Sequence, residues 1–102
     1  MYVIDEHLFT KATGVTYQSP QGLLFRQIAV RSLQKIEQDI PHSQELTKQL
    51  AHKVKGIALS CGMSDIARIC SKVESYDRVI NAKIAKNILS NKVKVMIQLC
   101  ES

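Results

Sequence analysis

The chain has 102 residues, enough to bury a single hydrophobic core, so we expect residues 1–102 to form one domain. Hydrophobic residues make up 45% of it, with four glycines and two prolines, which favours a helical protein; no apolar run approaches the roughly 20 residues of a membrane span. The formal net charge is +5, but the basic residues are sparse and lack interleaved aromatics or a helix-turn-helix or zinc pattern, so DNA binding stays a minor alternative.

The first two helices are predicted from their end signals. A brief helix is expected from Ile4 to about Thr13, ended by Gly14. Ser19 is the expected N-cap of the next helix, with Pro20 at its first position and Pro41 as its stop. The apolar residues of this second helix recur every three or four positions and are predicted to face the core: Phe25, Ile28, Ala29, Leu33, Ile36 and Ile40.

The third and fourth helices are predicted on either side of Gly62. The third is expected from Gln44 to about Cys61, with Ser43 as its cap. Its buried stripe is predicted to consist of Leu46, Leu50, Val54, Ile57, Ala58 and Cys61. The fourth starts at Ser64 or at the glycine turn. Its inward residues are predicted to be Ile66, Ile69, Cys70, Val73 and Ile80.

A last helix is predicted from about Asn81 to Leu99, although its phase is imperfect. Its shared apolar face is expected to contain Ile84, Ile88, Val95, Met96 and Leu99. Lys92 falls among these residues, so a kink would be needed; the alternation from Lys92 to Val95 alternatively suggests a short strand. With short connections between helices, the sequence predicts an all-α, antiparallel up-and-down four-helix bundle with a short extra N-terminal helix.

One patch of the third helix carries residues that suggest chemistry. At about 100° per residue, His52 lies roughly 160° from the centre of the buried stripe and should point to solvent. Lys55, Gly56 and Leu59 fall on the same face, and Lys48 adds a cation one turn before the histidine. Gly56 destabilises a helix by up to about 1 kcal/mol relative to alanine, and close approach of another molecule would account for its presence.

These side chains suit the handling of phosphate. An exposed imidazole offers a free ring nitrogen that can attack phosphorus at neutral pH. The transferring phosphoryl group spreads negative charge over its oxygens, and Lys55 can offset that charge. Such an exposed lysine contributes about 0.2–1 kcal/mol, which orients phosphate but does not make a complete catalyst. The residues therefore predict a phosphoryl carrier that relies on a partner for catalysis.

The run Ala51-His52-Lys53-Val54-Lys55-Gly56, followed by Gly62, resembles the signature of histidine-containing phosphotransfer (HPt) domains of bacterial and plant phosphorelays. The segment from Ile66 to Glu74 is similar to the family's second signature, in which a helix ends near an apolar-Glu pair. Ile4-Asp5 looks like the apolar-Asp pair that opens many such domains. The resemblance covers most of the chain in layout, but Ile57 and Leu59 stand where members often carry small or polar residues.

The resemblance implies that His52 is phosphorylated, that Lys55 assists and that Gly56 leaves room for a partner. The implied partners are response-regulator receiver domains, a hybrid sensor kinase, or both. We expect a receiver to dock on the outer face formed by the third helix and the helix that follows it, and to contact Lys48 and Leu59 as well as Gly56. The receiver would supply the magnesium, so no cofactor of the chain's own is expected. Without a Gly-rich phosphate loop, we expect a carrier and not an enzyme with its own kinase activity. We also expect a monomer.

A non-catalytic helical module that docks receivers through the same face remains an open alternative. Other sites are not supported: His7 and His42 are too scattered to bind a metal with His52, and Glu74 is interpreted as a solvated residue or an ion-pair partner. The three cysteines show no metal-binding spacing, and their odd number argues against a disulfide framework. A reducing cytoplasm fits this pattern, and Cys61 and Cys70 are predicted to lie in the core.

Overall fold

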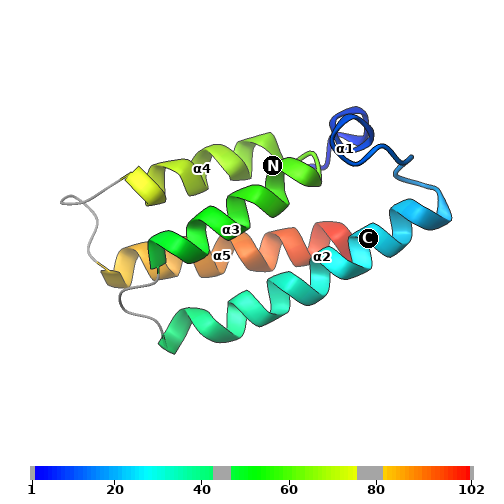
Figure 1. Cartoon of the computed structure of the whole chain (residues 1–102). Coiled ribbons are helices and arrows are strands. Elements are labelled where there is room, and N and C mark those ends of the chain that lie inside the picture. The colour runs from blue at the N-terminus through cyan, green and yellow to red at the C-terminus, as the bar shows by residue number, and fades with distance from the viewer. Residues whose placement is uncertain (1, 43–46, 76–81, 102) are drawn as a thin grey trace.

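The computed structural model describes residues 2–42, 47–75 and 82–101, and these ranges are helical without a β-strand (Figure 1). The elements are α1 (Glu6–Thr13), α2 (Pro20–Asp39), the short 3-10 helix η1 (Ile40–His42), α3 (Thr47–Ser60), α4 (Ser64–Ser75) and α5 (Ala82–Glu101). The all-α prediction is therefore confirmed. Within the same ranges, no helix combines the length and the apolar character that crossing a membrane requires. Expectations for Ser43, Gln44, Leu46, Ile80 and Asn81 lie outside the described residues.

The four longer helices lie side by side in an elongated bundle of 42 × 22 × 21 Å, and α1 sits near the turn between α3 and α4 (Figure 1). The most extensive contacts join α3 to α4 and α2 to α5. Helices α2 and α3 contact each other much less. The bundle thus consists of two closely packed helix pairs with a looser seam between α2 and α3.

The predicted helix ends are present in the structure. The Ser19 hydroxyl accepts a hydrogen bond from the Gly22 backbone N–H at 3.0 Å, and Pro20 opens α2. Gly14 ends α1 with a φ of 77°. Pro41 follows α2 within η1. Local capping signals therefore identify these boundaries correctly.

One hydrophobic core joins all five α-helices. Its largest fully buried side chains are Phe9, Leu33, Val54, Met63, Ile66, Leu89, Val93 and Met96. The predicted stripe of α3 is correct in the described part, since Leu50, Val54, Ala58 and Cys61 are buried and Ile57 packs against them. Cys70 is buried as expected, and Cys100 is buried as well.

The prediction for α2 was wrong at Ile28, which is 53% exposed. Arg26 is buried on this part of α2 instead. Its guanidinium lies 4.2 Å from the centre of the Tyr17 ring and donates a hydrogen bond to the Tyr17 hydroxyl at 3.3 Å. Arg26 also donates to the Cys100 carbonyl at 3.5 Å. The Tyr17 ring and the C-terminal end of α5 thus stabilise the charge of Arg26 inside the protein. Ile28 is therefore not part of the buried stripe of α2.

The prediction for α5 was wrong at Ile84, which is 46% exposed, and no kink is needed. One continuous helix, α5, buries a stripe of residues spaced by fours and threes: Leu89, Val93, Met96 and Cys100. Lys92 lies beside this stripe, with its ammonium 4.6 Å from the centre of the Tyr2 ring. Lys92 can therefore lie beside the buried stripe of a continuous helix, because the Tyr2 ring stabilises its ammonium group through a cation–π contact.

The turn between α3 and α4 depends on Gly62. Its φ is 76°, a backbone conformation that residues other than glycine rarely adopt. A Cβ there would collide with the Asp5 carbonyl oxygen and lie 3.0 Å from the Phe9 nitrogen. The Asp5 N–H donates to the Gly62 carbonyl at 2.9 Å. The segment before α1 is thus held directly against this turn.

We predict that Gly62→Ala destabilises the protein more than Gly14→Ala. Both glycines have a positive φ, so alanine introduces about 1–2 kcal/mol of backbone strain at each. A Cβ meets nothing within 4 Å at Gly14 but collides with backbone at Gly62, which adds roughly 1–3 kcal/mol. Urea unfolding followed by circular dichroism measures both free energies. Equal losses would contradict the steric role of the turn.

Candidate functional site

His52 lies on α3 and points to solvent, with 72% of its side chain exposed. Its neighbours Ala51 and Val54 are fully buried, so the backbone beneath the histidine is fixed by the core. The outward direction expected from the helical phase is therefore observed. The imidazole stands on a rigid helix while its ring edge remains accessible.

The imidazole contacts a carboxylate from the neighbouring helix. Its Nδ1 lies 2.7 Å from Oε1 of Glu74, which is on the last turn of α4. The Glu74 side chain is 26% exposed, so water screens this pair only in part. The contact spans 22 positions in sequence, and the antiparallel return of α4 along α3 brings the two residues level (Figure 1).

Lys55 faces the same carboxylate. Its Nζ lies 3.9 Å from Oε2 of Glu74, and its side chain is 34% exposed. At this distance and exposure, the ion pair contributes at most about 1 kcal/mol to stability. One carboxylate oxygen of Glu74 therefore contacts His52 and the other faces Lys55, so the Lys55 ammonium lies beside the imidazole.

The contact with Glu74 determines which nitrogen of His52 is available. An ionised carboxylate can only accept a hydrogen bond, so Nδ1 carries the proton. In the neutral ring, Nε2 then keeps its lone pair. The arrangement can orient the imidazole and present a nucleophilic nitrogen to the outside.

The remaining residues predicted for the site, Lys48, Gly56 and Leu59, lie exposed on α3 near His52. Gly56 is exposed, and a Cβ built on it meets nothing within 4 Å, so the fold itself does not require glycine there. Leu59 is 51% exposed. Lys48 is exposed one turn before His52. The structure thus brings His52, Lys55, Gly56 and Leu59 to one side of α3, as the helical phase predicted.

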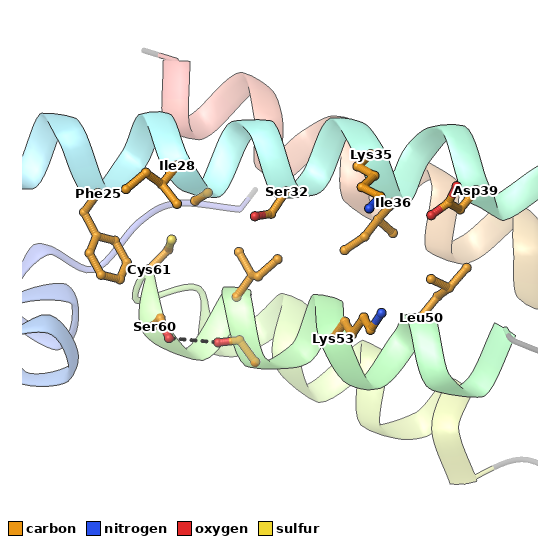
Figure 2. Close-up of a pocket in the computed structure, with 13 residues that line it drawn as sticks. Phe25, Ile28, Ser32, Lys35, Ile36, Asp39, Leu50, Lys53, Ser60 and Cys61 are labelled. Carbon is orange, nitrogen blue, oxygen red and sulfur yellow. Dashed lines mark hydrogen bonds between the residues drawn. The ribbon is translucent and has the colours of Figure 1, made fainter.

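A groove of about 620 Å³ runs along the seam between α2 and α3. Its apolar lining includes Phe25, Ile28, Leu50 and Ile57. Figure 2 shows the side chains of Phe25 on α2 and Leu50 on α3 directed into the space between the two helices. Gly56 also lines the groove, so the groove adjoins the side of α3 that carries His52. Sequence reasoning missed this feature because it assigned Ile28 to the core.

Glu74 is the residue of this site that sequence reasoning interpreted too weakly. It was expected to be solvated or to form an ion pair, and its contact with the histidine was not anticipated. The signal was present: His52 precedes Gly62 by ten residues and Glu74 follows it by twelve. Two antiparallel helices joined at that glycine bring such positions to the same level.

A metal centre is not supported in the described ranges, where no three His, Cys, Asp or Glu residues are grouped to hold an ion. His7 and His42 are exposed on α1 and η1, apart from His52 on α3. Whether a partner supplies magnesium stays a prediction.

Comparison with known proteins identifies one family. The family model for the Hpt domain matches residues 23–99, which is more than half of the chain and includes every site residue described above. Searches of curated proteins and of solved structures returned no match. The chain therefore belongs to the Hpt domain family, whose members are phosphocarrier modules of two-component signalling that interact with response-regulator receiver domains and are not autonomous kinases.

Proposed function

We propose that this chain accepts a phosphoryl group on His52 from the aspartyl phosphate of one receiver domain and passes it to the aspartate of another. The observation that carries the proposal is the 2.7 Å contact between His52 Nδ1 and Glu74 Oε1. It holds an exposed imidazole with its second nitrogen free, on a face that a second protein can reach. A solvated surface histidine needs no such partner.

In the proposed transfer, the Nε2 lone pair of His52 attacks phosphorus in line with the bond to the receiver aspartate. That bond breaks, and the receiver carboxylate leaves with the bonding electrons. The imidazole becomes positively charged as its Nε2 bonds to phosphorus, and the Glu74 carboxylate stabilises this charge through the Nδ1 proton. Attack by a second receiver's aspartate on the same phosphorus reverses the step and frees the histidine.

Lys55 assists by offsetting charge on the phosphoryl oxygens. Its Nζ lies 3.9 Å from Glu74, so a small side-chain movement takes it from the carboxylate to a phosphate bound on the histidine. One partly exposed lysine provides too little stabilisation to catalyse the reaction alone. The magnesium and the remaining catalytic groups therefore belong to the receiver in this mechanism, and the chain needs no cofactor of its own.

The receiver is proposed to dock over α3, with Gly56 and Leu59 in contact and Lys48 providing further positive charge. The exposed apolar side chains Leu24 and Ile28 of α2 extend this surface across the groove (Figure 2 shows Ile28). The surface expected from the sequence extended from α3 toward α4. Exposed leucine and isoleucine on α2 instead support an extension toward α2.

We propose that the chain acts as a monomer in the cytoplasm and that a hybrid sensor kinase can replace one of the receivers as its partner. We also propose an antiparallel up-and-down arrangement of α2–α5, with α1 as the extra helix. The close pairing of α3 with α4 and of α2 with α5 supports this arrangement.

The first prediction of this mechanism concerns His52→Gln. Incubation of the protein with receivers that a small phosphodonor has phosphorylated should add one phosphate, acid-labile and alkali-stable, detected by intact mass. His52→Gln should abolish it, whereas the matched variant His7→Gln, at another exposed histidine, should keep it. Receiver binding without any transfer would favour the non-catalytic docking module instead.

The second prediction concerns Glu74→Gln. The neutral amide holds the Nδ1–H tautomer less firmly and stabilises the imidazolium less. We expect the transfer rate at saturating receiver to fall roughly ten-fold to a hundred-fold, as is typical when the partner that orients a histidine is changed, with receiver affinity unchanged. Rapid-quench kinetics measure both. The control Asp65→Asn changes a carboxylate at the other end of α4, where it pairs with Arg68 at 3.9 Å. If Glu74→Gln matched the wild-type rate, the orienting role would be refuted.

The third prediction separates docking from stability at Gly56. Gly56→Ala should raise the free energy of unfolding by up to about 1 kcal/mol, because alanine favours helix and the new Cβ meets open space. The same Cβ should slow transfer from receivers by obstructing their approach. Direct phosphorylation of His52 by phosphoramidate serves as the control and should be unchanged. Unaltered transfer from receivers would show that Gly56 has no docking role.

A further inference from the structure

The groove between α2 and α3 combines apolar side chains with a charged stretch. Lys35 from α2 and Lys53 from α3 both line it, and Figure 2 shows their ammonium groups directed into the space between the two helices. Asp39 lines the groove one helical turn from Lys35. Two cations and one carboxylate give this stretch of the groove a net positive charge.

The two lysines are available to a second molecule. Both are exposed. The ion pairs between described residues are made with Glu74 and Asp65, and neither Lys35 nor Lys53 takes part in them. Like charges that face the same groove repel each other, and a carboxylate that lies between them relieves this repulsion. The stretch is therefore suited to an acidic group of a partner.

The charged stretch adjoins the reactive face of α3. Lys53 directly follows His52 in the sequence, and Gly56 lines the groove less than one turn further along the helix. The helix from Thr47 to Ser60 contains three lysines and no aspartate or glutamate. A partner that covers the groove thus lies next to His52 and meets a positively charged surface.

The shape of the groove fits a helical segment of the partner. Its lining extends from Phe25 to Asp39 on α2 and from Leu50 to Cys61 on α3, which is about 16–21 Å of each helix. A helix of about three to four turns has this length. Amphipathic helices bind by laying their apolar side into grooves of this kind.

On the basis of the proposed function, we propose that Lys35 and Lys53 select receivers by charge. The groove accepts a helical segment whose apolar side is flanked by carboxylates, and it disfavours one flanked by lysine or arginine. Phe25, Ile28 and Ile57 contact the apolar side, and the two lysines contact the carboxylates. A second copy of this chain is a poorer occupant, because both copies carry a formal net charge of +5.

Two synthetic amphipathic peptides of about four helical turns are the probes for the test. They share one leucine stripe, which is flanked by glutamates in the first peptide and by lysines in the second. Fluorescence anisotropy measures the binding of each peptide to the full chain. We expect the glutamate peptide to bind at least about ten-fold more tightly at low ionic strength, and we expect the difference to shrink as salt is added.

Charge reversal in the groove tests the role of the two lysines. Lys35→Glu combined with Lys53→Glu should reverse the order of the two affinities. The matched control combines Lys11→Glu with Lys94→Glu, which changes the net charge by the same amount outside the groove lining and should keep the wild-type order. All four lysines are exposed, so the core stays intact, and circular dichroism checks the fold.

An apolar substitution places the peptides in the groove. Ile28→Ala should weaken both peptides by a similar factor, because it removes an apolar contact and changes no charge. The proposal is overturned if neither peptide binds, if the glutamate peptide is not preferred, if the control variant also reverses the order, or if Ile28→Ala leaves both affinities unchanged.

Peptide binding involves no phosphate, so it is independent of the carrier activity. His52→Gln should bind both peptides as the wild type does. A wild-type chain that phosphoramidate failed to phosphorylate on His52 would contradict the phosphocarrier proposal, whereas a peptide preference that the groove variant failed to reverse would contradict charge selection. The two failures are therefore distinguished by separate measurements.

Discussion

The register between α3 and α4 is the constraint on which the site depends. Gly62 sets it by adopting a positive φ where its missing side chain leaves room for the Asp5 carbonyl. From that turn the two helices run back along each other, and His52 meets Glu74 near their far ends. A shift of one residue in either helix would rotate one partner by about 100° and separate them. A backbone feature about ten residues away thus controls the orientation of an imidazole.

In the proposed transfer, the tasks of the site are divided between two molecules. The chain would supply the nucleophilic imidazole of His52, the Glu74 carboxylate that contacts its Nδ1 and the nearby cation of Lys55. Nothing in the described residues encloses the histidine or excludes water from it. An open site of this kind suits a module that exchanges a group with other proteins, since an enclosed site would have to open at each exchange.

Sequence reasoning predicted the features that depend on local signals and on helical phase. It identified the caps at Ser19 and Gly14 and the outward direction of His52. It failed where a tertiary contact overrides hydropathy. Arg26 is buried because an aromatic ring and the end of α5 receive its charge, and Ile28 is exposed as a consequence. No periodicity reveals such a pairing, because the partners come from distant parts of the chain.

The looser seam between α2 and α3 has a consequence for how this protein can change. Glu74 approaches His52 from one side of α3, whereas the groove lies on the other side of the same helix. Substitutions along α2 can therefore alter the shape and charge of the groove without touching the group that orients the imidazole. Duplicated copies of such a chain could diverge in the partners they choose while their reactive centre stays the same.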